Sequence, residues 1–321
     1  MTSPLLVLPG AVEADAPDSG VAAHYGSIAR EQRRLVAAAE ADVPPTFVDL
    51  SHRDVVAVTG PDRLGWLHSL TTQHLTSLAP RTPTQALILS PQGRVEHAFD
   101  GVDDGETFWA DTEPGRGAAL AAWLDSMRFM MRVEVADVSA DWAVVGLPAL
   151  RHALVRREDL AAYPEDHGAP VGLWAWEALR IEAGRPRFGL DTDDKTIPNE
   201  VGWVSVPGRE AAVHLDKGCY RGQETVARVH TLGRPPRRLV LLHLDGSAEH
   251  LPAPRSEVTA DGRVVGFVGS AAHHHELGPI ALALVKRNVP LDIDLLADGV
   301  PAAQQAIVDP EAGLHVRPVL R

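Results

Sequence analysis

The only cysteine of this 321-residue chain, Cys219, lies in a run of charged and small residues that could support thiol chemistry. The run extends from Asp216 to Glu224, with Lys217 two positions before the cysteine and Arg221 two positions after it. The thiolate is the nucleophilic and metal-binding form of cysteine, and nearby cations favour it. This pattern indicates a reactive thiol if both cations turn toward the sulfur. The alternative is a buried cysteine that packs as a small hydrophobic residue.

A helix start would strengthen the first interpretation. Asp216 is a plausible N-cap for a helix that runs through Val229, which would place Cys219 in the first turn. Unpaired backbone N–H groups and the helix dipole favour an anion there. Because the chain has one cysteine, it cannot form an internal disulfide. Redox or metal chemistry would therefore need a partner thiol, a small thiol or a shared metal centre.

The elements that must position this run alternate between strands and helices in the first half of the chain. Apolar spacing and tight turns predict α+β layers, with helices on one face of mostly antiparallel sheets. Residues 1–20 read as a loose arm. The expected helices are 21–41, one around 64–70, and 114–124; the expected strands are 55–58, 86–89, 94–99, 108–110, 133–138 and 142–147.

The second half begins with an expected helix over residues 173–183, which Gly184 would end. After Pro235-Pro236 the pattern becomes all-β, as in a small barrel or sandwich. The expected strands there are 239–244, 257–259, 264–269 and 281–285. We therefore predict three parts: an N-terminal arm and helix (1–45), an α+β region of two interleaved subdomains (46–234) and a C-terminal β-barrel (235–321).

Composition restricts the classes of partner. The formal net charge of −13 argues against nucleic-acid and anionic-membrane binding, which depend on positive fields. No apolar run approaches the ~18–20 residues of a membrane span. Residues 5–8 are apolar but lack a basic flank, so we expect no secretory signal. A single cysteine fits a reducing cytoplasm.

The run from Lys217 to Arg228 resembles the signature of the YgfZ family, which consists of folate-binding proteins of iron–sulfur cluster assembly. The resemblance covers roughly residues 46–290. It implies the fold of the glycine-cleavage T-protein superfamily, with two interleaved ferredoxin-like α+β domains and a C-terminal β-barrel. It also implies that Cys219 is the functional thiol, with Lys217, Arg221, Gln223 and Glu224 around it. The implied partners are iron–sulfur assembly proteins and recipient apo-enzymes.

The resemblance also implies a site for tetrahydrofolate or a related reduced folate. Glu182 ends the expected helix, where a carboxylate opposes the helix dipole, and it matches a T-protein glutamate that contacts the pteridine ring. A carboxylate suits the adjacent N–H donors of a pterin edge. Trp203 could stack on a flat ring or belong to the core. Arg228 begins a basic strip that suits an anionic tail or an acidic partner, or is a solvated surface.

One departure from the T-protein pattern weakens the case for an enzyme. An Asp just after the hairpin glycine serves one-carbon chemistry in the aminomethyltransferase. Here Gly93 is followed by Arg94, Val95, Glu96 and His97, and no Asp occurs before Asp100. We therefore expect a folate-binding accessory protein rather than an enzyme. A folate-dependent aminomethyltransferase or demethylase with Glu96 or His97 as base stays open. A ligand-free interaction scaffold is the third hypothesis.

Other motifs carry less weight. The run His273-His274-His275-Glu276 invites a metal interpretation, but adjacent side chains point in different directions, so we expect an ordinary loop. His68 and His74 have no partner Cys or carboxylate at ligand spacing. The sequence contains neither a glycine-rich phosphate loop nor a Gly-x-Ser-x-Gly nucleophile elbow.

Overall fold

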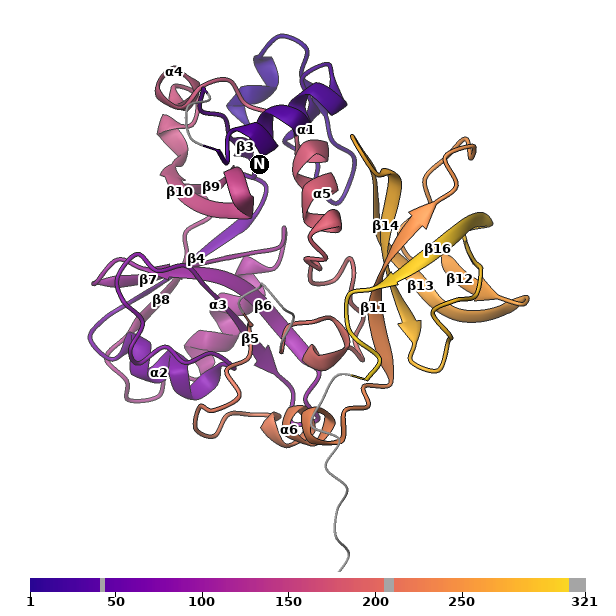
Figure 1. The fold of residues 1–321 in the computed structure, drawn as a ribbon. Helices are drawn as coiled ribbons and strands as arrows, with labels where there is room; N and C mark the ends of the chain where they lie inside the picture. The colour runs from indigo at the N-terminus through magenta and orange to yellow at the C-terminus, as the bar shows by residue number, and fades with distance from the viewer. Residues whose placement is uncertain (41–43, 205–210, 312–321) are drawn as a thin grey trace, which may run out of the picture. The chain divides into compact units, whose positions relative to one another are not determined.

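The computed structural model describes residues 1–40, 44–204 and 211–311. The chain forms two compact units, each built from segments that are distant in the sequence. Unit 1 contains Met1–Arg63, Asp100–Ala183 and Ala272–Leu277; unit 2 contains Leu64–Phe99, Gly184–Ala271 and Gly278–Arg321. The chain therefore passes repeatedly between units, and β-strands and α-helices occur in both, in agreement with the predicted interleaved α+β class (Figure 1).

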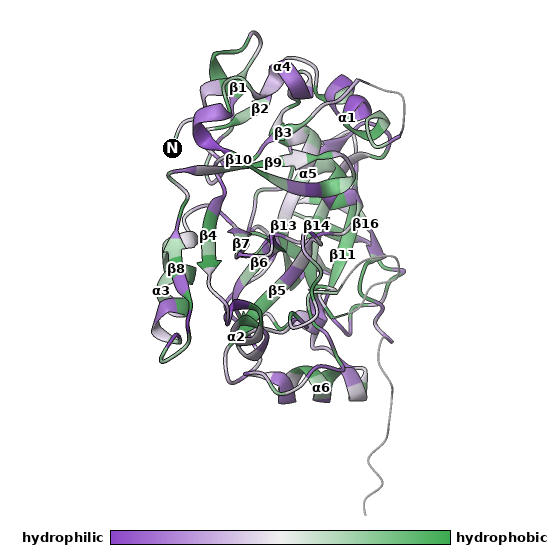
Figure 2. Cartoon of the chain, turned by 90° about the vertical axis from the view of Figure 1, so that its left-hand side faces the viewer, coloured by the Kyte–Doolittle hydropathy of each residue, from purple (hydrophilic) through white to green (hydrophobic). Residues whose placement is uncertain are grey.

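A five-stranded sheet has the order β5-β6-β7-β4-β8. Three valines and Ala57 fill the buried positions of β4, and Figure 2 shows this strand as hydrophobic. Helix α3 (Gly117–Ser126) lies against β4 and β8, and the Asp54 carboxylate accepts a hydrogen bond from the Gly117 N–H at 2.7 Å. The strands are β4 (Asp54–Thr59), β5 (Thr84–Leu89), β6 (Val95–Asp103), β7 (Thr107–Thr112) and β8 (Glu134–Asp137).

A second, three-stranded sheet of unit 1 has the order β10-β9-β3. Its strands are β3 (Val48–Asp49), β9 (Trp142–Leu147) and β10 (Arg151–Arg156). Helices α5 (Leu173–Glu182) and α1 (Ile28–Ala37) pack on one another beside this sheet (Figure 1). Trp176 of α5 fills the space over Gly146, where an added Cβ would lie 2.7 Å from the indole. This contact fixes α5, and hence its last residue, against the sheet.

The N-terminal segment differs from the expected loose arm. It contains η1 (Pro4–Val7), β1 (Val12–Glu13) and β2 (Ala22–His24), and the side chains of Leu5 and Val21 are buried. The expected helix 21–41 begins only at Ile28, and residue 41 lies outside the described residues. The Glu31 carboxylate explains the late start, because it accepts hydrogen bonds from the N–H groups of Tyr25 and Ser27.

The C-terminal region closes into a six-stranded barrel of order β11-β14-β13-β12-β15-β16, as predicted. Its core is aliphatic, with Val240, Leu242 and Val258 among the fully buried side chains. Strand β11 begins directly after Pro236, and the two short last strands are additions to the expectation. The strands are β11 (Arg237–Leu244), β12 (Glu257–Ala260), β13 (Arg263–His274), β14 (Gly278–Lys286), β15 (Leu295–Ala297) and β16 (Val300–Ala306).

The remaining elements are short. Three helices, α2 (Arg63–Leu70), α4 (Tyr163–His167) and α6 (Gln223–Leu232), complete the α-helices of the described residues; η2 (Pro148–Leu150), η3 (Arg157–Asp159) and η4 (Pro198–Glu200) are 3-10 turns. Within the described ranges, every helix is too short or too polar to cross a bilayer.

In unit 2, the start of α6 lies against the hairpin turn between β5 and β6 without room for side chains. Gly222 has a φ of 80°, and a Cβ on it would lie 2.4 Å from the Ser90 carbonyl oxygen and 2.9 Å from the Gly93 Cα. A Cβ on Gly93 would meet the Thr225 Cβ at 2.6 Å. Two glycines thus set the distance between the hairpin and the cysteine-bearing segment.

We predict that Gly222→Ala lowers the free energy of unfolding by more than the ~1–2 kcal/mol that a left-handed backbone alone imposes. The added methyl group must also displace the backbone at Ser90. Gly262→Ala is the matched control, since Gly262 has a φ of 72° and open space at its Cβ position. Urea unfolding of both variants measures the difference. Equal losses in the two variants would show that the close approach contributes nothing.

Candidate functional site

Cys219 is exposed and lies in a loop of unit 2, ahead of α6 rather than within it. The prediction of a helix from Asp216 is wrong, because α6 begins at Gln223 with Gly222 as its N-cap. The Gln223 side chain accepts a hydrogen bond from the Tyr220 N–H at 2.9 Å, which stabilises the turn before the helix. The thiol therefore does not sit in a helical first turn. The alternative of a buried structural cysteine is also wrong.

The two cations near the cysteine have other partners. Lys217 is buried, and its ammonium donates hydrogen bonds to the carbonyl oxygens of His68 and Thr71, at the end of α2. Burial lowers the pKa of Lys217 to about 8. Arg221 donates a hydrogen bond of 2.9 Å to the carboxylate of Glu96. The condition for activation of the thiol, that both side chains turn toward the sulfur, is therefore not supported by their hydrogen bonds, which go to other partners.

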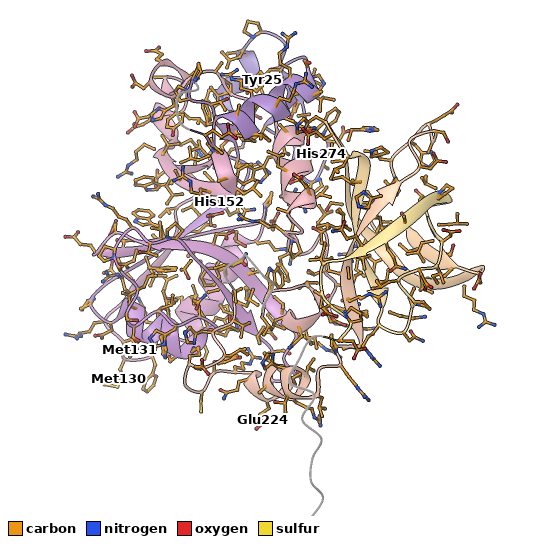
Figure 3. All side chains as sticks on the ribbon, in the orientation of Figure 1. Tyr25, Met130, Met131, His152, Glu224 and His274 are labelled. Carbon is orange, nitrogen blue, oxygen red and sulfur yellow. The ribbon has the colours of Figure 1, made fainter. Side chains whose placement is uncertain are left out.

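The other residues predicted around the thiol lie on α6. Glu224 is exposed in the first turn, where its charge suits the positive end of the helix dipole (Figure 3). Arg228 is exposed one turn further along. Gln223 has the capping role just described. The sequence motif thus forms one continuous loop-and-helix surface of unit 2, and its exposed residues include Cys219, Arg221, Glu224 and Arg228.

Trp203 packs in the interior of unit 2, with 3% of its surface exposed. Its backbone N–H donates to the Pro198 carbonyl, and its own carbonyl accepts from Val213. Next to this segment, Arg237 forms hydrogen bonds with Glu200 at 2.8 Å and Asp193 at 2.6 Å. Trp203 is therefore a core residue in this structure, and its stacking on a ligand ring stays a prediction.

Glu182 is the last residue of α5 in unit 1, as the sequence predicted, and 45% of its side chain is exposed. Its Oε2 atom lies 3.3 Å from Nε2 of His274, which is almost completely buried at the end of β13 (Figure 3). The histidine run is therefore not the ordinary loop that we expected. The adjacency of three histidines is the signal that could have indicated this. Successive side chains on a strand point to opposite faces, so one histidine of such a run faces the interior.

A buried charge cluster in unit 1 was not predicted. Arg53 donates to Asp111 at 2.7 Å and Glu113 at 2.9 Å, and it lies 3.7 Å from Asp100. Nδ1 of His152 lies 3.0 Å from Asp111 (Figure 3). One ligand atom each from Asp100, Asp111 and His152 would fit around a cation. The Arg53 guanidinium already supplies a positive charge there, so the cluster reads as an internal ion-pair network.

We predict that Lys217→Met lowers the free energy of unfolding by about 1–3 kcal/mol, because it leaves two carbonyl groups without their donor. Lys195→Met is the control, since Lys195 is exposed. Urea unfolding gives the stability, and the rate of labelling by a disulfide reagent gives the reactivity of Cys219. A tenfold slower labelling at unchanged stability would instead mean that the Lys217 charge activates the thiol.

His152 should make stability depend on pH. Burial lowers its pKa, but the Asp111 carboxylate and then Asp100 outweigh this effect, so the net shift is upward. The protonated ring is therefore favoured in the folded state, and its contribution is complete below pH ~6.5 and lost as pH rises through the raised pKa. We expect His152→Gln to remove this part of the pH dependence in urea unfolding. The exposed His250→Gln should leave it intact; parallel curves for both variants would contradict the assignment.

Comparisons with known proteins agree with this architecture. The family profile of the glycine cleavage T-protein C-terminal barrel domain matches residues 237–305. A putative chloroplastic transferase of Arabidopsis thaliana, At1g60990, is 26% identical over 70% of this chain and 61% of its own length. The tRNA-modifying protein YgfZ of Cronobacter sakazakii is 25% identical over 69% of this chain and 77% of its own length. Several proteins named aminomethyltransferase are also relatives.

A solved structure extends the match to the whole fold. The glycine cleavage system aminomethyltransferase T from Bartonella henselae superposes with a TM-score of 0.76, covers 98% of this chain and 99% of its own, and is 17% identical. That identity supports the fold alone, and the chain spans less than two thirds of the Arabidopsis relative. The chain therefore has the fold of the glycine-cleavage T-protein superfamily, carries its C-terminal barrel domain and has a YgfZ protein among its homologues.

Proposed function

We propose that this protein binds a reduced folate and uses the Cys219 thiol in the assembly or repair of iron–sulfur clusters in recipient apo-enzymes. The observation that carries the proposal is the exposed lone thiol on a surface motif of a T-protein-like fold. The presence of a YgfZ protein among the homologues supports it.

Folate binding is inferred from Glu182. A carboxylate at a helix C-terminus faces the negative end of the dipole, which disfavours it by a few tenths to about 1 kcal/mol. Here the group is kept half-exposed at the end of α5, where it can accept hydrogen bonds. A pterin edge presents adjacent N–H donors, and hydrogen bonds to a charged acceptor are the strong ones. The donor set and the ligand therefore fit in chemical type.

The thiol would act together with groups from other molecules. Cys219 is the chain's only cysteine, and the group of described residues that could surround a cation does not include it. A partner must therefore supply the other ligands of a cluster in transfer. It must likewise supply the second thiol of any thiol exchange. The exposure of Cys219 makes such an approach sterically feasible. We infer a role as an accessory protein whose partners are iron–sulfur assembly proteins and recipient apo-enzymes.

A folate-dependent aminomethyltransferase or demethylase is the second candidate, favoured by relatives that are named aminomethyltransferase. Its base would be Glu96 or His97, after the hairpin glycine. The Glu96 carboxylate forms an ion pair with Arg221 of the cysteine motif at 2.9 Å. That geometry suits positioning of the loop better than proton abstraction. A ligand-free scaffold is the third candidate, and measured folate binding would exclude it.

We predict that calorimetric titration with tetrahydrofolate gives specific binding, which Glu182→Ala weakens by about 10–100-fold, as expected for lost hydrogen bonds to a charged group. Cys219→Ala should bind folate as wild type does, yet fail to restore iron–sulfur enzyme activities in cells that lack the native gene. Glu134→Ala, an exposed carboxylate of unit 1, is the control.

Each half of the proposal can fail separately. Full complementation by Cys219→Ala would refute the role of the thiol, whereas unchanged folate affinity in Glu182→Ala would refute the pterin contact. Tetrahydrofolate-dependent turnover of glycine-derived or sarcosine-type donors would favour the transferase. Loss of that turnover in Glu96→Gln would then identify the base.

A further inference from the structure

The turn that follows β13 determines which nitrogen of His274 carries the proton. Nδ1 of this histidine accepts hydrogen bonds from the backbone N–H groups of Glu276 at 3.2 Å and Leu277 at 3.1 Å. A nitrogen that accepts from two donors has no hydrogen of its own. The neutral ring must therefore carry its proton on Nε2, since the second nitrogen decides the tautomer.

The Nε2–H group faces Glu182. Nε2 is buried and has no hydrogen-bond partner of good geometry among the described residues, yet it lies 3.3 Å from Oε2 of Glu182. A buried donor without an acceptor is unfavourable. Among the described residues, the Glu182 carboxylate is therefore the acceptor that lies within reach of this group. Such contacts in ligand-free sites are often long and shorten when the ligand binds.

Gln32 holds the histidine turn in place from helix α1. Its side chain is completely buried, its amide nitrogen donates to the His273 carbonyl at 2.7 Å, and its amide oxygen accepts from the His275 N–H at 2.8 Å. The amide thus pairs with the backbone on both sides of His274, as a neighbouring strand would. This pairing fixes the direction of the intervening side chain, which points to the end of α5.

We propose that His274 is a positioning residue that orients the Glu182 carboxylate for its ligand, with Gln32 holding the turn that carries it. The proposal rests on the proposed folate contact of Glu182. The Nε2–H group occupies one carboxylate oxygen and leaves the other to accept from the ligand. All the groups involved, Gln32, Glu182 and residues 273–277, belong to unit 1.

The histidine is suited to this task because it stays neutral. Burial lowers the pKa of His274, and the adjacent His275 acts in the same direction, whereas Glu182 and Glu276 oppose the shift. Protonation would also place a hydrogen on Nδ1, against the two backbone donors at Glu276 and Leu277. A neutral donor contacts the carboxylate without placing a positive charge beside it.

Two substitutions separate the two sides of the ring. In His274→Asn the amide oxygen can take the place of Nδ1 and keep the turn, but nothing reaches Glu182. In His274→Gln the amide nitrogen can take the place of Nε2 and keep the contact. We expect His274→Asn to weaken tetrahydrofolate binding about tenfold, the effect of one hydrogen bond to a charged group. His274→Gln should retain affinity within about threefold of wild type, and thermal melts should show that both variants are folded.

The controls distinguish this proposal from the one on which it rests. If Glu182→Ala binds folate as wild type does, the pterin contact itself is wrong. If Glu182→Ala loses affinity while His274→Asn does not, the positioning role is wrong. In the double variant, His274→Asn should add no further loss to Glu182→Ala; full additivity would contradict a role through Glu182.

A measurement on the unaltered protein avoids the risk that a variant misfolds. Nitrogen-15 NMR of the labelled histidines reports the tautomer directly. We expect the His274 ring to show an unprotonated Nδ1 and a protonated Nε2, and to keep this state below the ordinary histidine pKa of ~6.5. Protonation on Nδ1 would overturn the proposal.

Discussion

The buried ammonium of Lys217 is the interaction on which the cysteine-bearing surface depends. It binds two carbonyl groups, of His68 and Thr71, at the end of α2, where a helix leaves its last carbonyls without internal partners. The loop that carries the thiol has no strand or helix of its own, so this contact replaces the hydrogen bonds that regular structure would supply. Burial lowers the pKa of this lysine to about 8, so its charged form has a measurable cost. The hydrogen bonds to the two carbonyl groups offset part of this penalty.

Buried side chains also form hydrogen bonds with backbone groups in unit 1, where the side chains are neutral or acidic. Gln32 pairs with the backbone on both sides of His274, and Glu31, the residue before it, accepts hydrogen bonds from Tyr25, Ser27 and Gly172. Two successive residues of α1 thus satisfy backbone groups of irregular segments. The Cys219 loop and the turn after β13 are irregular, and hydrogen bonds from the buried side chains of Lys217 and Gln32 hold them. This is how a loop can hold a side chain as firmly as a sheet does.

Much of the architecture followed from local sequence patterns, whereas the partners of charged side chains did not. Valine-rich β4 and the aliphatic barrel strands were predictable because the spacing of apolar residues indicates which positions are buried. The start of α6 was missed because Gly222 adopts a left-handed conformation against the hairpin, a contact between residues far apart in the sequence. Lys217 and Arg221 were placed near the sulfur by sequence distance alone. Long side chains instead reach whichever acceptor the fold brings close, and that depends on tertiary structure.

These partners change how the motif can work. With Lys217 bound to carbonyls and Arg221 paired with Glu96, the charges that flank Cys219 in the sequence are committed to holding the loop. The thiol is then distinguished by its accessibility rather than by an activating neighbour. Under the proposed accessory role, a partner would supply both the orientation and the remaining ligands for this exposed thiol. The Glu96–Arg221 pair acts in the same sense, because it places the carboxylate that could have replaced the missing hairpin Asp in a structural contact. The Glu96–Arg221 ion pair thus belongs to the same surface that presents the thiol.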